Sequence, residues 1–246
     1  MTLYYLRNFE LVRILTFIVS EIGVNWNGDF SLLKNMINYS KKCGCDAVKF
    51  QAYNEEIVKA HPENSRLMKA TISHENIEKI DSIAKEVGIE WFATPMYLEA
   101  VDLLNPYVKR FKMREFDGRK IIQNEYSELF EKVLSTKKEI IISSEKSPTN
   151  SKYYNNSNIK WLYCVPKYPC ELSDIDFSFL NEFNGYSNHV PKIIAPLTSV
   201  LLGAKIVEIH VTFDKNQNFI DNNVSFDFNE LEMLVRLIRE SEKIKR

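Results

Sequence analysis

The chain has 246 residues, 45% hydrophobic and 26% charged, a composition that is typical of a globular protein and excludes a disordered or fibrous one. Its 32 basic and 33 acidic residues give a net charge of −1 at pH 7, so we expect no binding to nucleic acid or to an anionic membrane. The apolar runs are far shorter than the ~20 residues that span a bilayer, and Arg7, Glu10 and Arg13 interrupt any signal-peptide core, so we predict a cytoplasmic protein.

Short β-branched or aromatic runs alternate with longer amphipathic stretches, which is the pattern of repeated βα units around a parallel sheet. The predicted strands cover residues 17–23, 46–52, 90–94, 108–114, 139–144, 160–165, 185–187 and 205–212. The predicted helices cover residues 30–43, 73–87, 97–104, 119–134, 174–183, 191–202 and 228–244. The segment 147–158 is polar and rich in turn residues, so we expect its helix to be shortened or replaced by a loop.

Eight such units in 246 residues fit one α/β barrel, since these barrels commonly have about 250 residues in a single domain. We therefore predict the α/β class and a (β/α)8 TIM barrel over residues 1–246, with residues 1–15 as an N-terminal extension. The site of such a barrel lies at the carboxyl ends of its strands.

Strand parity predicts which side chains point into the barrel, because successive residues face opposite sides and the side that faces the helices is apolar. This parity turns Glu208 and His210 inward on the last strand, and Lys49 on the second. It also turns Glu21 inward on the first strand and Lys112 on the fourth. We expect these groups to meet at one mouth of the barrel.

His189 and His210 end two apolar runs and Glu21 ends a third. On its own, a histidine of this kind is more often a hydrogen-bonded barrel residue than a metal ligand. Glu21 has a structural alternative too, as an ion-pair partner of Lys49, and so have the inward lysines, as partners of Glu208 and Glu115. Together at neighbouring strand ends, these metal- and proton-active groups predict a metal-dependent enzyme.

Six motifs resemble those of the sialic acid synthase family, the phosphoenolpyruvate-condensing enzymes that make N-acetylneuraminate, legionaminate and pseudaminate. They are EIGVNWNGD (21–29), DAVKFQ (46–51), FATP (92–95), LYCVPKYP (162–169), GYSNH (185–189) and GAKIVEIHVTFD (203–214). The resemblance covers about residues 16 to 240, and several ordered motifs are a far more specific signal than one short pattern. It implies that phosphoenolpyruvate condenses with an N-acylated amino sugar, such as N-acetylmannosamine, to give a nonulosonic acid and phosphate.

The resemblance also implies roles for individual residues. His189 and His210 would bind a divalent metal, which we expect to be Mn²⁺, with Mg²⁺ and Co²⁺ as alternatives. Glu21 would handle the water that attacks C2 of the donor, and Asp221 would contact the sugar or a metal-bound water. Phosphoenolpyruvate would be held by two lysines and four hydrogen-bonding residues: Lys49, Lys112, Thr94, Ser143, Tyr168 and Ser187.

Five positions depart from the family pattern. Trp26 stands where relatives have a histidine, and Asn188 where they have an aspartate. Glu115 replaces a phosphate-binding hydroxyl and would repel the donor unless a cation compensates. Glu145 replaces a glycine, and Pro166 replaces a small or polar residue.

Relatives also carry a C-terminal antifreeze-like domain, whereas this sequence ends after its last predicted helix. We therefore expect this domain to be missing, with its part taken by a separately encoded antifreeze-like protein or by a homodimer. Two hypotheses follow. The chain is either a variant synthase that joins phosphoenolpyruvate to an amino-sugar aldehyde, or a degenerate barrel that binds a sugar or a partner subunit without turnover.

Overall fold

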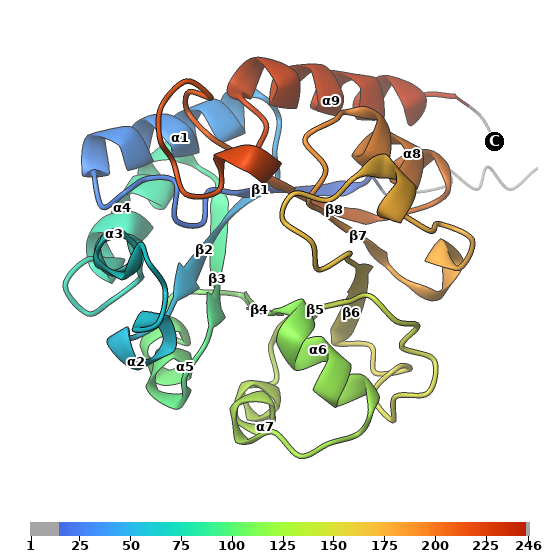
Figure 1. The fold of residues 1–246 in the computed structure, drawn as a ribbon, viewed down its shortest axis with the longest axis horizontal. Helices are drawn as coiled ribbons and strands as arrows, with labels where there is room; N and C mark the ends of the chain where they lie inside the picture. Colours follow the sequence, from blue (N-terminus) through green and yellow to red (C-terminus); the bar gives the residue numbers. More distant parts are fainter. Residues whose placement is uncertain (1–14, 245–246) are drawn as a thin grey trace, which may run out of the picture.

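The computed structural model describes residues 15–244, so all but the last residue of the predicted N-terminal extension lies outside the described residues. Eight parallel strands close into one barrel in the order β1 to β8, and β8 pairs with β1. Helices surround this barrel, with α1, α9 and α8 along one side and α5, α7 and α6 along the other (Figure 1). The predicted (β/α)8 TIM barrel is confirmed. No helix in the described part of the chain is both long and apolar enough to cross a membrane.

All eight predicted strands are present, with ends shifted by at most two residues. Their bounds are β1 Phe17–Glu21, β2 Ala47–Ala52, β3 Glu90–Pro95, β4 Arg110–Met113, β5 Glu139–Ser144, β6 Ile159–Tyr163, β7 Gly185–Asn188 and β8 Ile206–His210. The α-helices between residues 15 and 244 are α1 Phe30–Lys42, α2 Glu55–Val58, α3 Asn64–Ala70, α4 Ile77–Val87, α5 Leu98–Leu104, α6 Glu115–Ile122, α7 Glu128–Ser135, α8 Ile194–Leu201 and α9 Phe228–Ser241. Three short 3₁₀ helices are η1 Leu172–Asp174, η2 Leu180–Glu182 and η3 Asn222–Val224.

Local capping and apolar periodicity explain the well-predicted helices. In α9, the Asp227 side chain accepts hydrogen bonds from the N–H groups of Asn229 and Glu230, and the Glu230 side chain accepts one from the Asp227 N–H. This reciprocal capping box satisfies the exposed amides of the first turn. The helix therefore begins directly after Asp227, at Phe228, as predicted.

Two predicted helices are wrong. Residues 119–134 form two helices, α6 and α7, because Asn124 takes a left-handed conformation with φ of +59° and Ser127 caps a new helix by accepting a bond from the Phe130 N–H. Residues 174–183 form only the last residue of η1 and the short η2, since Phe177 and Phe179 turn inward and pack edge-on against Tyr163. The loop predicted over 147–158 is confirmed, because no helix occurs there.

The strand parity places polar side chains along the barrel axis as predicted. At the amino ends of the strands, the Arg110 guanidinium pairs with Glu90 at 2.7 Å and with Glu139 at 2.6 Å, and it lies over the Phe17 ring at 4.4 Å. This cluster fills the closed end of the barrel. Lys112, two residues further along β4, lies deeper toward the mouth and is only 3% exposed. The polar residues of the next layer make up the site.

Candidate active site

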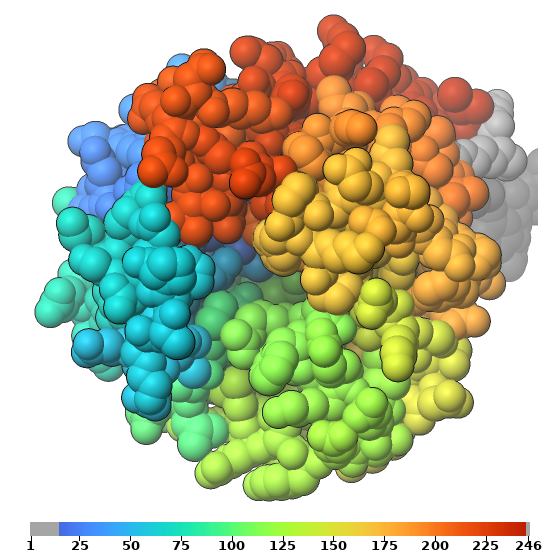
Figure 2. Space-filling model, viewed as in Figure 1, coloured from blue at the N-terminus to red at the C-terminus, as the bar shows by residue number. Residues whose placement is uncertain are grey.

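A cavity of about 470 Å³ opens at the carboxyl ends of the strands. It appears as the hollow near the centre of the face in Figure 2, ringed by the cyan, green, yellow-orange and red segments of the chain. All ten residues predicted from the sequence line it: Glu21, Lys49, Thr94, Lys112, Ser143, Tyr168, Ser187, His189, His210 and Asp221. The fold therefore brings the whole predicted set together, while the role of each residue stays a prediction.

The register between neighbouring strands places the central residues of the site opposite one another. Glu21 at the end of β1 is the direct partner of Lys49 on β2 and of His210 on β8. Ser187 on β7 is the partner of Glu208 on β8 in the same way. These side chains point to the same side of the sheet, because each pair shares its register and its parity. They therefore meet inside the barrel mouth.

One buried carboxylate holds both lysines of the pocket floor. Glu208 is 2% exposed, and its two oxygens accept hydrogen bonds from Lys112 Nζ at 2.9 and 3.0 Å. Lys49 Nζ lies 3.5 Å from Glu208 Oε1, and the Ser187 hydroxyl donates to the same oxygen at 3.0 Å. Of the two predicted lysine partners, Glu208 is confirmed, whereas Glu115 pairs with Arg119 instead. Glu208 was seen in the sequence only as a counterion, and its central position follows from barrel closure.

These contacts decide the charges of the buried groups. Burial works to raise the pKa of Glu208, but the ammonium groups of Lys112 and Lys49 hold that pKa well below its usual range. Burial works to lower the pKa of Lys49, yet the carboxylates of Glu208 and Glu21 keep it above the ordinary value. For Lys112, burial prevails over the attraction of Glu208 and lowers the pKa. The floor thus holds a carboxylate between two lysines, of which Lys112 binds its proton less firmly.

The two oxygens of the Glu21 carboxylate have different surroundings. Oε1 lies 2.9 Å from Lys49 Nζ and accepts a hydrogen bond from Gln51 Nε2 at 3.0 Å. Oε2 is buried and has no hydrogen-bond partner. A buried carboxylate oxygen with no donor is costly in a folded protein. This oxygen is therefore placed to accept a proton or a hydrogen bond from a ligand or a water in the cavity.

His189 is held in one orientation. Its Nδ1 lies 2.8 Å from the Val165 carbonyl oxygen, so this nitrogen carries the proton and donates it. Nε2 is then the unprotonated nitrogen and accepts a hydrogen bond from the Tyr168 hydroxyl at 2.7 Å. Burial lowers the pKa of His189, which favours this uncharged form. The arrangement is the one that fixes metal-binding histidines in proteins, where a backbone carbonyl orients the ring.

His210 lies beside His189, with ring centroids 5.3 Å apart. Its Nδ1 is buried without a hydrogen-bond partner and lies 3.5 Å from Asp221 Oδ2. Asp221 is brought there by the β8–α9 loop, whose backbone is tied to the β1–α1 loop: Asn25 Oδ1 accepts from the Asp221 N–H at 3.0 Å. Asn25 Nδ2 in turn donates to the Val211 carbonyl at 2.8 Å. Two loops far apart in sequence therefore place Asp221 against the second histidine.

The described residues contain no group of three or more His, Cys, Asp or Glu side chains placed to hold a metal ion. Any metal at His189 and His210 would thus have these two protein ligands, and its remaining positions would be open. An open coordination shell suits substrate binding better than a structural role.

The Ser143 hydroxyl faces the cavity from β5 and is also buried without a partner. The first turns of α6 lie directly against this strand, because Gly118 has no side chain. A Cβ atom at Gly118 would lie 2.0 Å from the Ser143 carbonyl oxygen. The missing side chain therefore sets how closely α6, with Glu115 and Arg119, approaches the pocket floor.

We expect Gly118→Ala to lower the free energy of unfolding by about 1–3 kcal/mol, the usual cost of overpacking. Urea unfolding followed by circular dichroism measures this change. Lys120→Ala, an exposed position on the same helix, is the control and should change stability by less than about 0.5 kcal/mol. Equal stability of the two variants would contradict the close approach of α6 to β5.

The departures from the family pattern fall in different places. Trp26 is buried outside the cavity lining, where its indole N–H donates to the Ala70 carbonyl. Glu145 is exposed and does not line the cavity either. Glu115 does line it but pairs with Arg119, and Pro166 lies at the exposed rim. Asn188 is buried and closes the turn after β7 by donating to the Val190 carbonyl at 2.8 Å.

Sequence reasoning missed one whole wall of the cavity. Tyr53, Ile57, Val58, His61 and Leu67 line it from the β2–α4 connection, which contains α2 and α3. These helices are only four and seven residues long, too short for a helical period to stand out. Among the residues found here, only Tyr53 could have been anticipated, since it directly follows β2.

Comparison with known proteins places this geometry among related barrels. The sequence matches the NeuB family over residues 36–246. It is 35% identical to an uncharacterised protein of Methanocaldococcus jannaschii, over 93% of this chain and 72% of that protein. It is 31% identical to the N,N'-diacetyllegionaminic acid synthase of Legionella pneumophila, again over 93% of this chain and 72% of the relative. The crystal structure of an N-acetylneuraminic acid synthetase from Leptospira borgpetersenii, in complex with citrate, has a TM-score of 0.82 and 27% identity, covering 93% of this chain and 84% of that one.

Proposed function

The chain belongs to the NeuB family, and on this premise we propose that it condenses phosphoenolpyruvate with an N-acylated amino sugar. In the proposed reaction, C3 of phosphoenolpyruvate forms a bond to the aldehyde carbon of the sugar. Water then adds at C2 and phosphate is released, so that phosphoenolpyruvate, aldehyde and water give a nonulosonic acid and phosphate. The observation that carries the proposal is the meeting of Glu21, the two lysines and the two histidines in one cavity.

The floor of the cavity suits the donor. Lys49 and Lys112 present two ammonium groups beside the hydroxyls of Ser143 and Ser187. Such fixed donors bind phosphate and carboxylate groups and do not need to reorganise as charge develops. Thr94, on β3, is 1% exposed and lines the same part of the cavity. We therefore assign the phosphate and carboxylate of phosphoenolpyruvate to this floor.

The balance of charged side chains in the cavity supports the binding of a metal ion. In the part of the chain that the structure describes, four lysines and arginines line it (Lys49, Lys112, Arg114 and Arg119), and four carboxylates oppose them (Glu21, Glu115, Glu208 and Asp221). The lining thus has no net positive charge, histidines aside, with which to bind a polyanionic donor. A divalent cation would supply two positive charges. This balance predicts that phosphoenolpyruvate binds weakly without metal.

The two histidines fit a metal site. His189 Nε2 is unprotonated and faces the cavity, where a metal would replace its hydrogen bond from Tyr168. The buried ring of His210 lies next to it. When bound, Mn²⁺ or a similar ion would act as a Lewis acid that polarises the sugar aldehyde. Mg²⁺ and Co²⁺ remain alternatives because histidine and oxygen ligands admit all three.

Glu21 is the group we propose to act on water. Lys49 and Gln51 fix Oε1 and leave Oε2 buried without a partner. A water bound to Oε2 would be oriented by a group that can accept its proton as it attacks C2, which is general-base catalysis. Asp221, beside His210, would contact the sugar from the other side of the histidine.

The degenerate-barrel alternative loses part of its support. Its support is that Glu115, Glu145 and Pro166 depart from the family pattern. Arg119 neutralises Glu115, and Glu145 lies outside the cavity lining. A barrel without turnover also has no physical need for Glu21 Oε2 and Ser143 Oγ to stay buried and unpaired.

Calorimetric titration of the metal-stripped protein tests the proposal. We expect Mn²⁺ to bind, and phosphoenolpyruvate to bind tightly only after Mn²⁺ has been added. His210→Ala should keep the far-ultraviolet circular dichroism of the parent protein but lose Mn²⁺ binding and with it the metal-assisted binding of phosphoenolpyruvate. Unchanged metal affinity in this variant would refute the proposed metal site. Failure of the parent protein to bind either ligand would favour the degenerate barrel.

The cytoplasmic location remains a prediction, and so does the contribution of a separate antifreeze-like protein or a second copy of the chain.

A further inference from the structure

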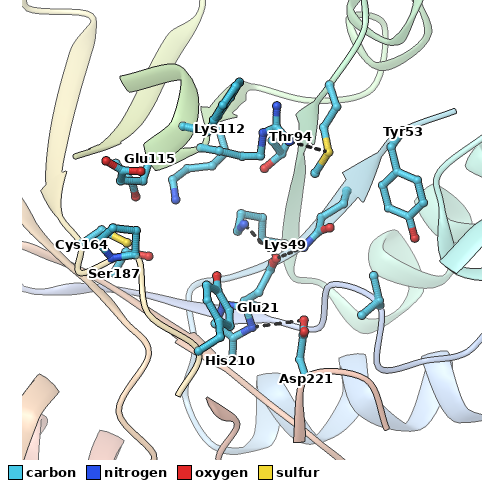
Figure 3. A pocket seen from close by; sticks show the side chains of 18 of the residues that line it. Glu21, Lys49, Tyr53, Thr94, Lys112, Glu115, Cys164, Ser187, His210 and Asp221 are labelled. Atoms are coloured by element: carbon cyan, nitrogen blue, oxygen red, sulfur yellow. Dashed lines mark hydrogen bonds and ion pairs between the residues drawn. The ribbon is translucent and has the colours of Figure 1, made fainter. Parts of the chain in front are cut away.

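The cavity has two unlike sides. One side, which we call the cationic side, consists of Arg114 and Arg119 above Lys112. The other, which we call the apolar side, is formed by aliphatic residues of the β1–α1 loop, of α2 and α3, and of the β8–α9 loop: Val24, Ile57, Val58, Leu67 and Ile220. In Figure 3, Glu115, Cys164 and Ser187 lie on one side of the pocket and Tyr53 on the opposite side, with Lys49 and Glu21 between them.

The proposed function, on which this inference rests, places the donor toward the cationic side. Lys112, Ser143 and Ser187 lie there, and the donor's phosphate and carboxylate need such groups. The aldehyde must then reach C3 of the donor from the remaining space. That space is bounded by the apolar side and by Asp221, which lies toward Tyr53 in Figure 3. The acceptor sugar therefore faces aliphatic side chains.

The apolar side offers no cation to an anionic substituent. Among the described residues that line the cavity, its lysines and arginines all belong to the floor or to the cationic side. Ile220 is followed in the β8–α9 loop by Asp221, whose carboxylate lines the same cavity and would repel a phosphate. The Tyr53 hydroxyl is not available either, because it donates to the Leu67 carbonyl at 2.7 Å. A phosphate here would be partly desolvated with no lysine or arginine as a partner and with only the His61 Nε2 proton as a donor, at a cost in affinity.

Apolar substituents, in contrast, would find contacts. Ile57 is 44% exposed although it lines the cavity, so an acyl methyl or a deoxy carbon could cover it. One polar group is present: His61 accepts a hydrogen bond from the Glu63 N–H on Nδ1, which leaves the Nε2 proton for a sugar hydroxyl. A second cavity of about 260 Å³ extends the space past His61, Tyr168 and Ile220. There is thus room for substituents at the far end of the sugar.

We propose that the acceptor is an uncharged N-acylamino aldose whose apolar substituents pack on Ile57, Leu67 and Ile220, and that its phosphorylated counterpart is a poor substrate. The assignment follows from the placement of the cavity's cations on the donor side and of its aliphatic side chains on the acceptor side. It names the class of acceptor that the family relationship leaves open.

The test compares N-acetylmannosamine with N-acetylmannosamine 6-phosphate, both in the presence of Mn²⁺. Phosphate release with phosphoenolpyruvate gives KM for each sugar, and calorimetry without phosphoenolpyruvate gives Kd. We expect the neutral sugar to have the lower KM and Kd, by about tenfold or more, because the phosphate would be desolvated next to Asp221. Equal or tighter binding of the phosphorylated sugar would overturn the proposal.

Ile57→Lys adds the missing cation at an exposed position of the apolar side. This variant should lower KM for the phosphorylated sugar by about tenfold through a charge-assisted contact, and it should raise KM for the neutral sugar. The matched control is Ile194→Lys, which is 53% exposed on α8 and does not line the cavity. It should leave both constants as in the parent protein. If Ile57→Lys changes neither constant, the acceptor does not lie on this side.

Failure of the inference can be told apart from failure of the proposed function. Phosphoenolpyruvate that binds with Mn²⁺ while neither sugar binds or reacts would refute the acceptor assignment and leave the donor half-site intact. Absence of phosphoenolpyruvate binding would instead refute the proposed function.

Discussion

Glu208→Ala is expected to lower the free energy of unfolding by about 3–5 kcal/mol, the cost of removing one partner from a buried ion pair. Among residues 15–244, Glu208 is the only side chain that pairs with Lys112, and it shares Lys49 with Glu21. Without it, two ammonium groups lie inside the barrel mouth, and Glu21 remains as a carboxylate partner for Lys49 but not for Lys112. Urea unfolding measured at pH 7 gives the change in free energy.

The pH dependence of this loss identifies its cause. Burial already lowers the pKa of Lys112 in the folded protein, and the loss of Glu208 would lower it further. As pH rises above that pKa, the folded protein no longer has to bury the charge, so the variant should regain part of its stability as pH rises from 7 toward the ordinary lysine pKa of about 10.4. Glu63→Ala removes a half-exposed partner of Arg66 and should cost less than about 1 kcal/mol. A Glu208→Ala variant no less stable than this control would disprove the role of the buried cluster.

Glu21→Gln is expected to reduce kcat for phosphate release by about 10²–10⁴-fold, the range for loss of a general base. The substitution preserves the shape of the side chain but leaves no carboxylate to take a proton from water. It also removes a negative charge 2.9 Å from Lys49 Nζ, so phosphoenolpyruvate should bind at least as tightly as before.

Steady-state kinetics and calorimetry separate these two effects. A fall in kcat with no loss of donor affinity supports a role of Glu21 in the chemical step. A weakened Kd for phosphoenolpyruvate with unchanged kcat would instead mean that Glu21 only maintains the binding site. Glu56→Gln, a change in an exposed carboxylate of α2, is the control and should alter neither constant.

Most of the fold could be predicted from local patterns. Eight strands followed from short apolar runs, and the parity of β8 turned Glu208 and His210 inward as the structure has them. These features depend on residues that are neighbours in sequence, so they are visible without tertiary structure. The errors arose where a single residue, or a contact between residues distant in sequence, determines whether a helix forms. Asn124 breaks the predicted helix 119–134, and packing on Tyr163 prevents a helix over 174–183.

The residues of the site were predicted, but their partners were not all predicted. Ten of the residues that line the cavity were predicted, seven of them within the six motifs, and the resemblance supplied their expected roles. The pairing of Glu115 with Arg119 was missed, although these residues are only four apart. It becomes visible only when α6 is known to begin at Glu115, which places both side chains on one helix face.

The sequence by itself determined the strand order, the inward-facing polar residues and the family, because these are properties of local periodicity and of motif identity. Only the tertiary structure decided that Glu208 lies between Lys49 and Lys112, that Glu21 keeps one oxygen unpaired, and that α2 and α3 form an apolar wall. Barrel closure is the physical reason. It brings strands and loops more than 150 residues apart, such as β1 and β8, within hydrogen-bond distance, and no local pattern encodes which buried charges will then meet.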